Sequence, residues 1–169
     1  MKIADFERVS IQQFNRDLKD LCDLEGPYYD NIKLPSRATS GSAGYDFVSP
    51  IDVDLEPGES VKIPTGIRCR IDEGYVLELH PRSSFGFKYQ MCLLNTTGII
   101  DADYYNADNE GHIIAAIVNR GNKKLSFKAG DRFVQGIFLK YYLAKEEEVN
   151  EERRGGFGST DTRAHSSIG

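Results

Sequence analysis

Residues 55–81 read LEPGESVKIPTGIRCRIDEGYVLELHP, and in this stretch short apolar runs alternate with turn residues. Residues 55–59 (LEPGE) are typical of a turn between two strands, because proline and glycine favour reversal of the chain there. Residues 75–79 (YVLEL) are rich in the residue types that favour strands. The stretch therefore predicts a series of short β-strands.

The same pattern extends in both directions, since glycine and proline divide residues 35–130 into short pieces rich in Val, Ile, Tyr and Phe. The longest apolar run, residues 113–118 (IIAAIV), has the length of a buried strand and is far below the roughly 18 residues that cross a membrane. Turn signals at this spacing favour a sandwich, a barrel or a jelly roll. We expect an all-β fold.

The two ends of the chain differ from this background. Residues 3–9 alternate apolar and charged, which predicts a strand, and Ser10 stands three residues before Gln13, the spacing of a capping box. Apolar residues then follow helical spacing up to Gly26-Pro27, which predicts one short helix: Ile11, Phe14, Leu18 and Leu21. Residues 145–154 are mostly charged and precede a glycine-rich segment and a polar tail, a pattern typical of a flexible arm.

A chain of 169 residues fits one domain. We predict a β domain over residues 1–144, which includes the N-terminal strand and helix within residues 1–26, and an arm over residues 145–169. The net charge of -5 argues against general nucleic-acid binding but not against a nucleotide substrate. Three cysteines without a CxxC spacing predict reduced thiols, and with no signal peptide or apolar span they predict a cytoplasmic protein that does not bind membranes.

Five short motifs stand out from the strand background: residues 43–46 (AGYD), 81–84 (PRSS), 95–104 (NTTGIIDADY), 130–135 (GDRFVQ) and 153–160 (RRGGFGST). In this order they resemble the trimeric all-β dUTPase family over about residues 33–160. The resemblance implies a distorted β-barrel or jelly roll and the hydrolysis of dUTP to dUMP and pyrophosphate with Mg²⁺. It also implies a homotrimer with shared active sites, in which no single chain is active.

In the first two motifs the resemblance implies contacts to metal and phosphate. Asp46 matches the aspartate that orients water ligands of Mg²⁺, an ion that keeps several of its waters. Arg82 offers a planar fork of donors that suits phosphate oxygens, and Ser83 offers a hydroxyl and a backbone N–H. Ser84 stands where the family more often has glycine.

In the third motif Asp101 follows an apolar run, residues 98–100 (GII), and begins a polar stretch. Asp103 and Asp108 lie nearby, and spacing alone does not choose among the three carboxylates. The resemblance implies that Asp101 is the general base that activates the attacking water. It also implies that Tyr104 stacks on the deoxyribose and leaves no room for a 2′-hydroxyl.

The same motif implies a uracil site. Asn95 begins the segment that forms a uracil-reading hairpin in the family, and Gly98 and Ile100 belong to the same substrate-binding segment. Residues 105–110 then form a longer loop than the family's usual turn before Gly111. His112, which has no histidine or cysteine near it in the sequence, is interpreted as structural.

The last two motifs imply further phosphate contacts. Gln135 matches a residue that reaches the phosphates and Arg132 one that shapes the site, although strand alternation puts the two on opposite faces unless a bulge intervenes. In the arm, the resemblance implies γ-phosphate contacts, a ring that closes over uracil and a glycine-rich anion cradle, from Arg153, Ser159, Thr160, Phe157 and Gly158.

Two alternatives stay open on the sequence. A dCTP deaminase-like enzyme on a related fold would use a different catalytic arrangement, and Asp101 with Tyr104 argues against it. A non-catalytic regulatory protein that senses the nucleotide could use the N-terminal helix and residues 105–110 to bind another protein. That second role can coexist with catalysis.

Overall fold

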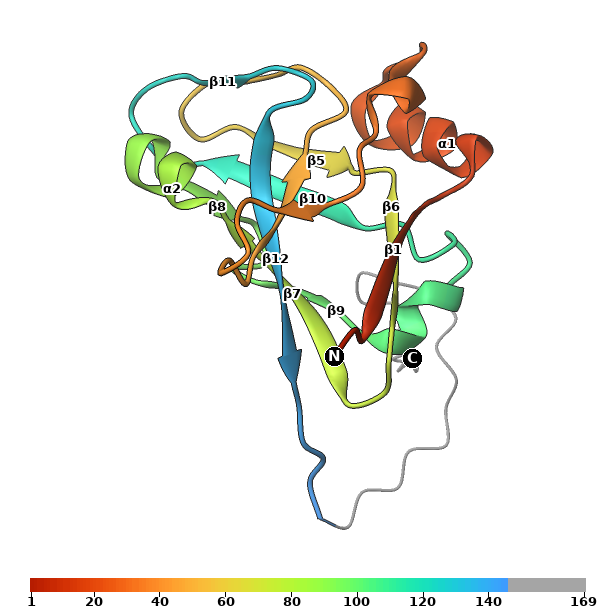
Figure 1. Cartoon of the computed structure of the whole chain (residues 1–169). Helices are drawn as coiled ribbons and strands as arrows, with labels where there is room; N and C mark the ends of the chain where they lie inside the picture. The colour runs from red at the N-terminus through yellow and green to blue at the C-terminus, as the bar shows by residue number, and fades with distance from the viewer. Residues whose placement is uncertain (146–169) are drawn as a thin grey trace, which may run out of the picture.

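The computed structural model describes residues 1–145 and has the predicted all-β architecture (Figure 1). Its strands are β1 (Ala4–Arg8), β2 (Ser36–Arg37), β3 (Tyr45–Val48), β4 (Val53–Leu55), β5 (Ser60–Pro64), β6 (Ile67–Ile71), β7 (Tyr75–Pro81), β8 (Met91–Leu93), β9 (Gly98–Ile100), β10 (Ile114–Asn119), β11 (Leu125–Phe127) and β12 (Arg132–Lys140). The helices are α1 (Ile11–Cys22) and α2 (Ser83–Tyr89), with 3-10 turns η1 (Tyr28–Asn31) and η2 (Ala102–Asn106). No helix among residues 1–145 is long and apolar enough to cross a membrane.

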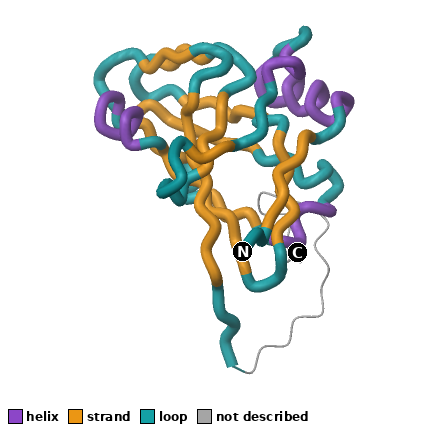
Figure 2. Tube along the Cα trace, viewed as in Figure 1, coloured by secondary structure: helices purple, strands orange, loops and turns teal. Residues whose placement is uncertain are grey.

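The strands form four antiparallel sheets of the jelly-roll type rather than one closed barrel over the described residues (Figure 2). The largest sheet has the order β2-β3-β12-β7-β9, and the others pair β5-β10-β8, β1-β6 and β11-β4. Side chains from all of these regions form one core, whose fully buried members include Phe14, Phe47, Ile63, Leu77, Ile117 and Phe133. Because β12 crosses the middle of the largest sheet, it brings distant motifs together.

The sequence predictions for individual elements are largely confirmed. Residues 55–59 connect β4 to β5, the run at 75–79 lies in β7, and the apolar run at 113–118 lies largely in β10. In α1 the hydroxyl of Ser10 accepts a hydrogen bond from the Gln13 N–H at 3.1 Å, as the capping spacing predicts. Phe14 and Leu18 are buried, so the middle of the predicted apolar stripe faces the core, whereas Ile11 at its start is exposed.

One helix was not predicted. Helix α2 begins within the second motif and lies outside the one helix that the sequence predicts. It has seven residues, and it includes a glycine and three aromatic side chains, so its helix propensity is low. The Phe85 ring packs against Phe127 of β11 with centroids 5.4 Å apart, and such tertiary packing stabilises a short helix that propensity does not predict.

Replacement of Ser10 by alanine is expected to lower the free energy of unfolding by about 1–2 kcal/mol, because the first turn of α1 loses its cap. Urea unfolding followed by circular dichroism, at one protein concentration, measures the change. Ser10→Thr is the matched control, since it keeps the hydroxyl. Equal unfolding midpoints for Ser10→Ala and the wild type would contradict the capping role.

Candidate active site

Three of the predicted motifs meet on the largest sheet. Strand β12 lies between β3 and β7, and its register sets Gln135 opposite Asp46 on one side and His80 on the other. Arg82 follows directly after β7. The sheet therefore gathers residues that lie far apart in the sequence.

Asp46 lies between two guanidinium groups. Its Oδ1 is 2.9 Å from Nε of Arg82 and its Oδ2 is 3.1 Å from Nη1 of Arg132. The Asp46 side chain is only 11% exposed and that of Arg82 only 26%, so water screens this pair weakly. Charge-assisted hydrogen bonds of this kind hold Arg82 in place and orient Arg132, whose side chain is 50% exposed.

A bulge in β12 explains why Arg132 reaches the same side as Gln135. The pairing with β3 shifts between Arg132 and Val134, so one extra residue interrupts the alternation of side chains. The bulge is the exception to strand alternation that the sequence left open, and it allows both side chains to lie on one face. The sequence shows no signal for this bulge beyond the turn at Gly130-Asp131 that precedes it.

Gly44 is a site residue whose role the sequence did not indicate. A Cβ atom at this position would lie 2.6 Å from Oε1 of Gln135, so any larger residue would displace that side chain. Gln135 is also held by its amide, which donates to the Pro81 carbonyl at 3.3 Å. Ser83 and Ser84 are exposed in the first turn of α2, beside this cluster in sequence.

Asp101 lies elsewhere, at the end of β9, and its carbonyl accepts the Tyr104 N–H at 3.2 Å as η2 begins. Asp101 lines a hollow on the surface, and residues of the segment after β12 line the same hollow. The residues lining this hollow are Ile71, Glu73, Gly74, Asp101, Ala102, Asp103, Tyr141 and Leu143. Asp103 shares the hollow, so geometry within one chain does not single out Asp101.

The other residues of the third motif are placed as follows. Tyr104 is 5% exposed, and its hydroxyl donates to the His112 carbonyl at 2.7 Å. Ile100 and Gly98 are buried, and Gly98 packs closely on β7. Asn95 is exposed in a turn between β8, which pairs with β10, and β9, which pairs with β7, and its role in a uracil site stays a prediction.

The Asp101 hollow and the arginine cluster lie at opposite ends of β7. Ile100 pairs with Leu77, which sets Asp101 beside Val76, whereas Arg82 follows six positions later along the chain. Six residues of extended strand span roughly 20 Å. A single chain therefore does not bring these two groups to the same phosphate.

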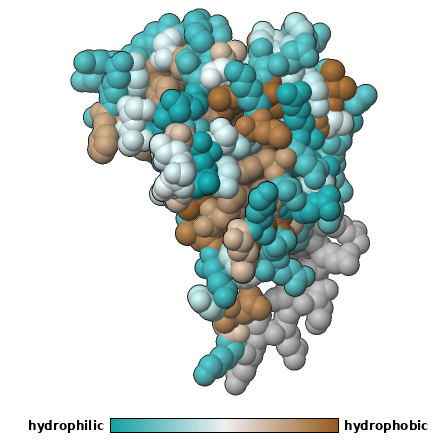
Figure 3. Space-filling view, viewed as in Figure 1, coloured by the Kyte–Doolittle hydropathy of each residue, from teal (hydrophilic) through white to brown (hydrophobic). Residues whose placement is uncertain are grey.

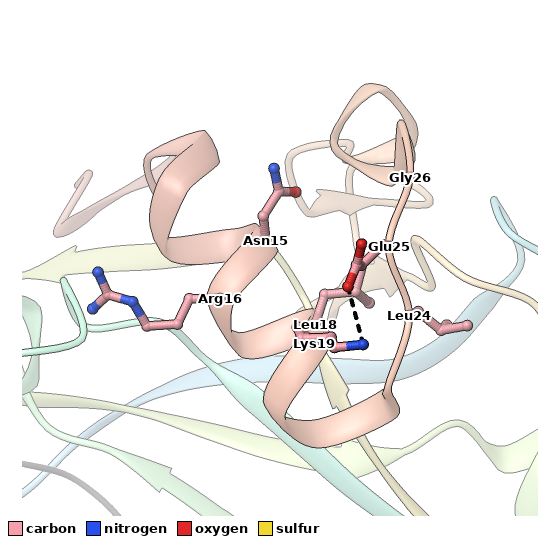
Figure 4. A pocket seen from close by; sticks show the side chains of 7 residues that line it. All are labelled: Asn15, Arg16, Leu18, Lys19, Leu24, Glu25 and Gly26. Atoms are coloured by element: carbon pink, nitrogen blue, oxygen red, sulfur yellow. Dashed lines mark ion pairs between the residues drawn. The ribbon is translucent and has the colours of Figure 1, made fainter.

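A second hollow lies beside α1 and contains none of the predicted site residues (Figure 4). Lys19 points toward Glu25 across it, with Nζ 3.0 Å from the carboxylate, and it also contacts Asp23 at 2.7 Å. The fifth motif, including Arg153, Phe157, Gly158, Ser159 and Thr160, lies outside the described residues.

Residues 30–162 match the model of the dUTPase family. The chain is 42% identical over 132 residues to the deoxyuridine 5′-triphosphate nucleotidohydrolase of Lactococcus lactis, a match that covers 76% of this chain and 88% of that one. It is 34% identical over 144 residues to the protein of the same name from Desulfotalea psychrophila, with 81% and 93% covered. The crystal structure of the dUTPase from Streptococcus mutans superimposes with a TM-score of 0.63 at 34% identity and covers 83% of this chain and 98% of that one.

The chain folds as a jelly-roll type protein. Its clustered polar residues, Asp46, Arg82 and Arg132, come from three motifs that lie far apart in the sequence. With the family model matched over most of its length, the chain belongs to the dUTPase family.

Proposed function

We propose that this chain is a dUTP diphosphatase, which hydrolyses dUTP to dUMP and pyrophosphate. The observation that carries the proposal is the presence of two sets of charged side chains near opposite ends of β7. One is the carboxylate of Asp101, and the other is the pair of arginines that Asp46 holds. The relatives described above bear the name of this activity. A dCTP deaminase is not favoured, because those relatives are nucleotidohydrolases.

In this mechanism Asp101 is the general base. It removes a proton from a water molecule while the water oxygen attacks the α-phosphorus, and the bond from that phosphorus to the bridging oxygen breaks. Pyrophosphate leaves with the electron pair, and Asp101 later returns the proton to solvent. General-base assistance of this kind contributes about 10²–10⁴-fold to the rate.

The arginine cluster supplies charge neutralisation. Arg82 and Arg132 are positioned before a nucleotide arrives, because Asp46 holds both guanidinium groups. Pre-positioned donors stabilise developing negative charge without the cost of reorganisation. Gln135 adds an amide donor, and Ser83 and Ser84 add hydroxyl groups to the same phosphate site.

The residues present fit a magnesium ion carried by the nucleotide. Among residues 1–145 no cluster of three or more His, Cys, Asp or Glu side chains could hold a metal ion alone. Mg²⁺ commonly uses one or two carboxylates, several waters and the substrate's phosphates. Each oxygen of Asp46 keeps a lone pair beyond its arginine contact and can accept from a metal-bound water. When bound, the ion would neutralise part of the phosphate charge.

Asp46→Asn is expected to lower kcat/KM for dUTP about 5–30-fold, since loss of one charged hydrogen-bond partner costs about 1–2 kcal/mol. Both arginines lose their anionic partner in this variant. Steady-state kinetics with magnesium measures the effect, and Asp5→Asn, an exposed aspartate of β1, is the matched control. Unchanged kinetics in Asp46→Asn would rule out its positioning of the arginines for catalysis.

The roughly 20 Å between Asp101 and Arg82 supports a site shared between chains. The exposed apolar residues Leu139, Tyr142 and Leu143 lie at the end of β12 and beyond it, where Figure 3 shows apolar atoms at the lower end of the molecule. Exposed apolar surface of this kind favours burial against another chain. A closed ring of three chains would set Asp101 of one subunit against Arg82 of the next, with the arm residues closing the site.

The substrate is tested by incubating the purified protein with dUTP, dCTP, dTTP and UTP separately, with and without magnesium, and measuring pyrophosphate. We expect release from dUTP alone, and only with magnesium. Ammonia release from dCTP would support the deaminase alternative instead. A protein that releases nothing from any nucleotide would overturn the proposed activity and direct attention to a protein partner.

A further inference from the structure

Helix α1 contacts the long loop at residues 105–110. The carboxylate of Glu110 accepts the Ser10 hydroxyl at 2.6 Å and the Ser10 N–H at 2.8 Å, and these hydrogen bonds lower the pKa of Glu110. Figure 1 shows α1 and η2 on the same side of the molecule, with the turn that follows η2 running between them. The family model matches from residue 30, so α1 lies before the matched residues. Helix α1 and the loop at residues 105–110 therefore form one unit.

The shortest hydrogen bond in this unit joins Asp17 of α1 to His112. The imidazole Nδ1 is 2.5 Å from Asp17 Oδ2, and the His112 side chain has no exposed surface. The Gly66 N–H donates to the other ring nitrogen, Nε2, at 2.8 Å. Nε2 therefore carries no hydrogen, and the ring hydrogen is on Nδ1, which donates to Asp17.

The surroundings of Asp17 keep it ionised. Burial raises the pKa of this carboxyl, but the hydrogen bonds from His112 and Gln13 outweigh burial and leave the pKa below its ordinary value. The Gln13 amide donates to the same oxygen at 2.9 Å. An anionic acceptor at this position holds the imidazole in a single orientation.

The backbone of His112 extends this chain of contacts to the third motif. Its carbonyl accepts the Tyr104 hydroxyl at 2.7 Å, and Asn109 donates to the same hydroxyl at 2.8 Å. The orientation of the Tyr104 ring thus depends on His112, and that of His112 depends on Asp17. Asp101 precedes Tyr104 by three residues, and its carbonyl accepts the Tyr104 N–H at 3.2 Å.

We propose that Asp17 is a positioning residue that acts through His112 to orient Tyr104 against the deoxyribose. The inference rests on the proposed function, in which Tyr104 contacts the sugar. It assigns α1 a role in substrate binding rather than in the chemical step. The consequence is a selective effect on KM, and on the preference for dUTP over UTP, with little effect on kcat.

A double-mutant cycle tests this role. Asp17→Ala is expected to raise KM for dUTP about 3–10-fold and to narrow the preference over UTP, while kcat changes less than about twofold. Asp20→Ala, an exposed aspartate of the same helix, is the matched control and should match the wild type. Asp17→Asn keeps an oxygen that accepts from Nδ1, and it should restore most of the affinity.

Tyr104→Phe closes the cycle, because it keeps the ring and removes the hydroxyl that His112 holds. In this background Asp17→Ala should raise KM by less than about twofold, since coupled residues are not additive. If Asp17→Ala does not fold by circular dichroism, Asp17→Leu replaces it in the cycle, because leucine favours the helix and accepts no hydrogen bond from His112.

Each outcome decides between two proposals. A wild-type protein that hydrolyses dUTP, with KM effects that multiply in the double variant, would overturn the positioning role alone. An equal fall in kcat for Asp17→Ala and Asp17→Asn would do the same. A wild-type protein without dUTP hydrolysis would overturn the proposed function, and the role of Asp17 with it.

Discussion

Asp101→Asn is expected to lower kcat for dUTP about 10²–10⁴-fold, because asparagine keeps the shape of the side chain but does not take up the proton of the attacking water. The affinity for dUTP should change little, since binding depends on other groups. Single-turnover pyrophosphate release measures the chemical step, and calorimetry with dUTP measures binding to the slow variant.

Asp103→Asn is the matched control for this experiment. Asp103 lines the same hollow and carries the same charge, so its replacement changes the local electrostatics without removing the assigned base. We expect kcat to stay within about threefold of the wild type, an effect of the size that one nearby exposed charge produces. A larger loss in Asp103→Asn than in Asp101→Asn would transfer the role of base to Asp103.

Mixing two inactive variants is expected to restore activity if the site is shared between chains. Asp101→Asn lacks the base and Arg82→Ala lacks the arginine that Asp46 holds. In a randomly mixed trimer each intact site needs Asp101 from one chain and Arg82 from another. Each condition is met half of the time, so about one quarter of the sites should be intact.

The mixture is made by unfolding the two variants together in urea and refolding them, and it is compared with each variant refolded alone. Wild-type protein carried through the same steps sets the full activity, and light scattering gives the mass of the assembly. A mixture that stays as inactive as its components would contradict a shared site, provided that the refolded wild type is active.

Much of the fold follows from local patterns in the sequence. The cap at Ser10 and the apolar stripe of α1 predict the helix, and punctuation by glycine and proline predicts the strands. Helix α2 does not follow from local pattern, because packing of Phe85 against Phe127 stabilises it across 42 residues of sequence. The formation of such a short helix depends on its tertiary packing more than on the helix propensity of its residues.

In the candidate site too, some features follow from local sequence patterns and others depend on tertiary structure. The motifs identify Asp46, Arg82 and Gln135, but the involvement of Arg132 depends on a bulge that leaves no local signal. The structural reading of His112 agrees with its complete burial, whereas its partner Asp17 lies 95 residues away and was not predicted. The division into a domain and an arm, the roles of the arm residues and the cytoplasmic location stay predictions.

The carboxylate between Arg82 and Arg132 has a consequence for competition among anions. Without a nucleotide, the two cations already have an internal counter-ion, so a small anion from the surroundings gains little by displacing Asp46. A polyanion that engages several donors at once gains much more, because its contacts add together on one molecule. If these arginines bind the nucleotide as proposed, Asp46 would therefore favour a triphosphate over single phosphate ions at this position.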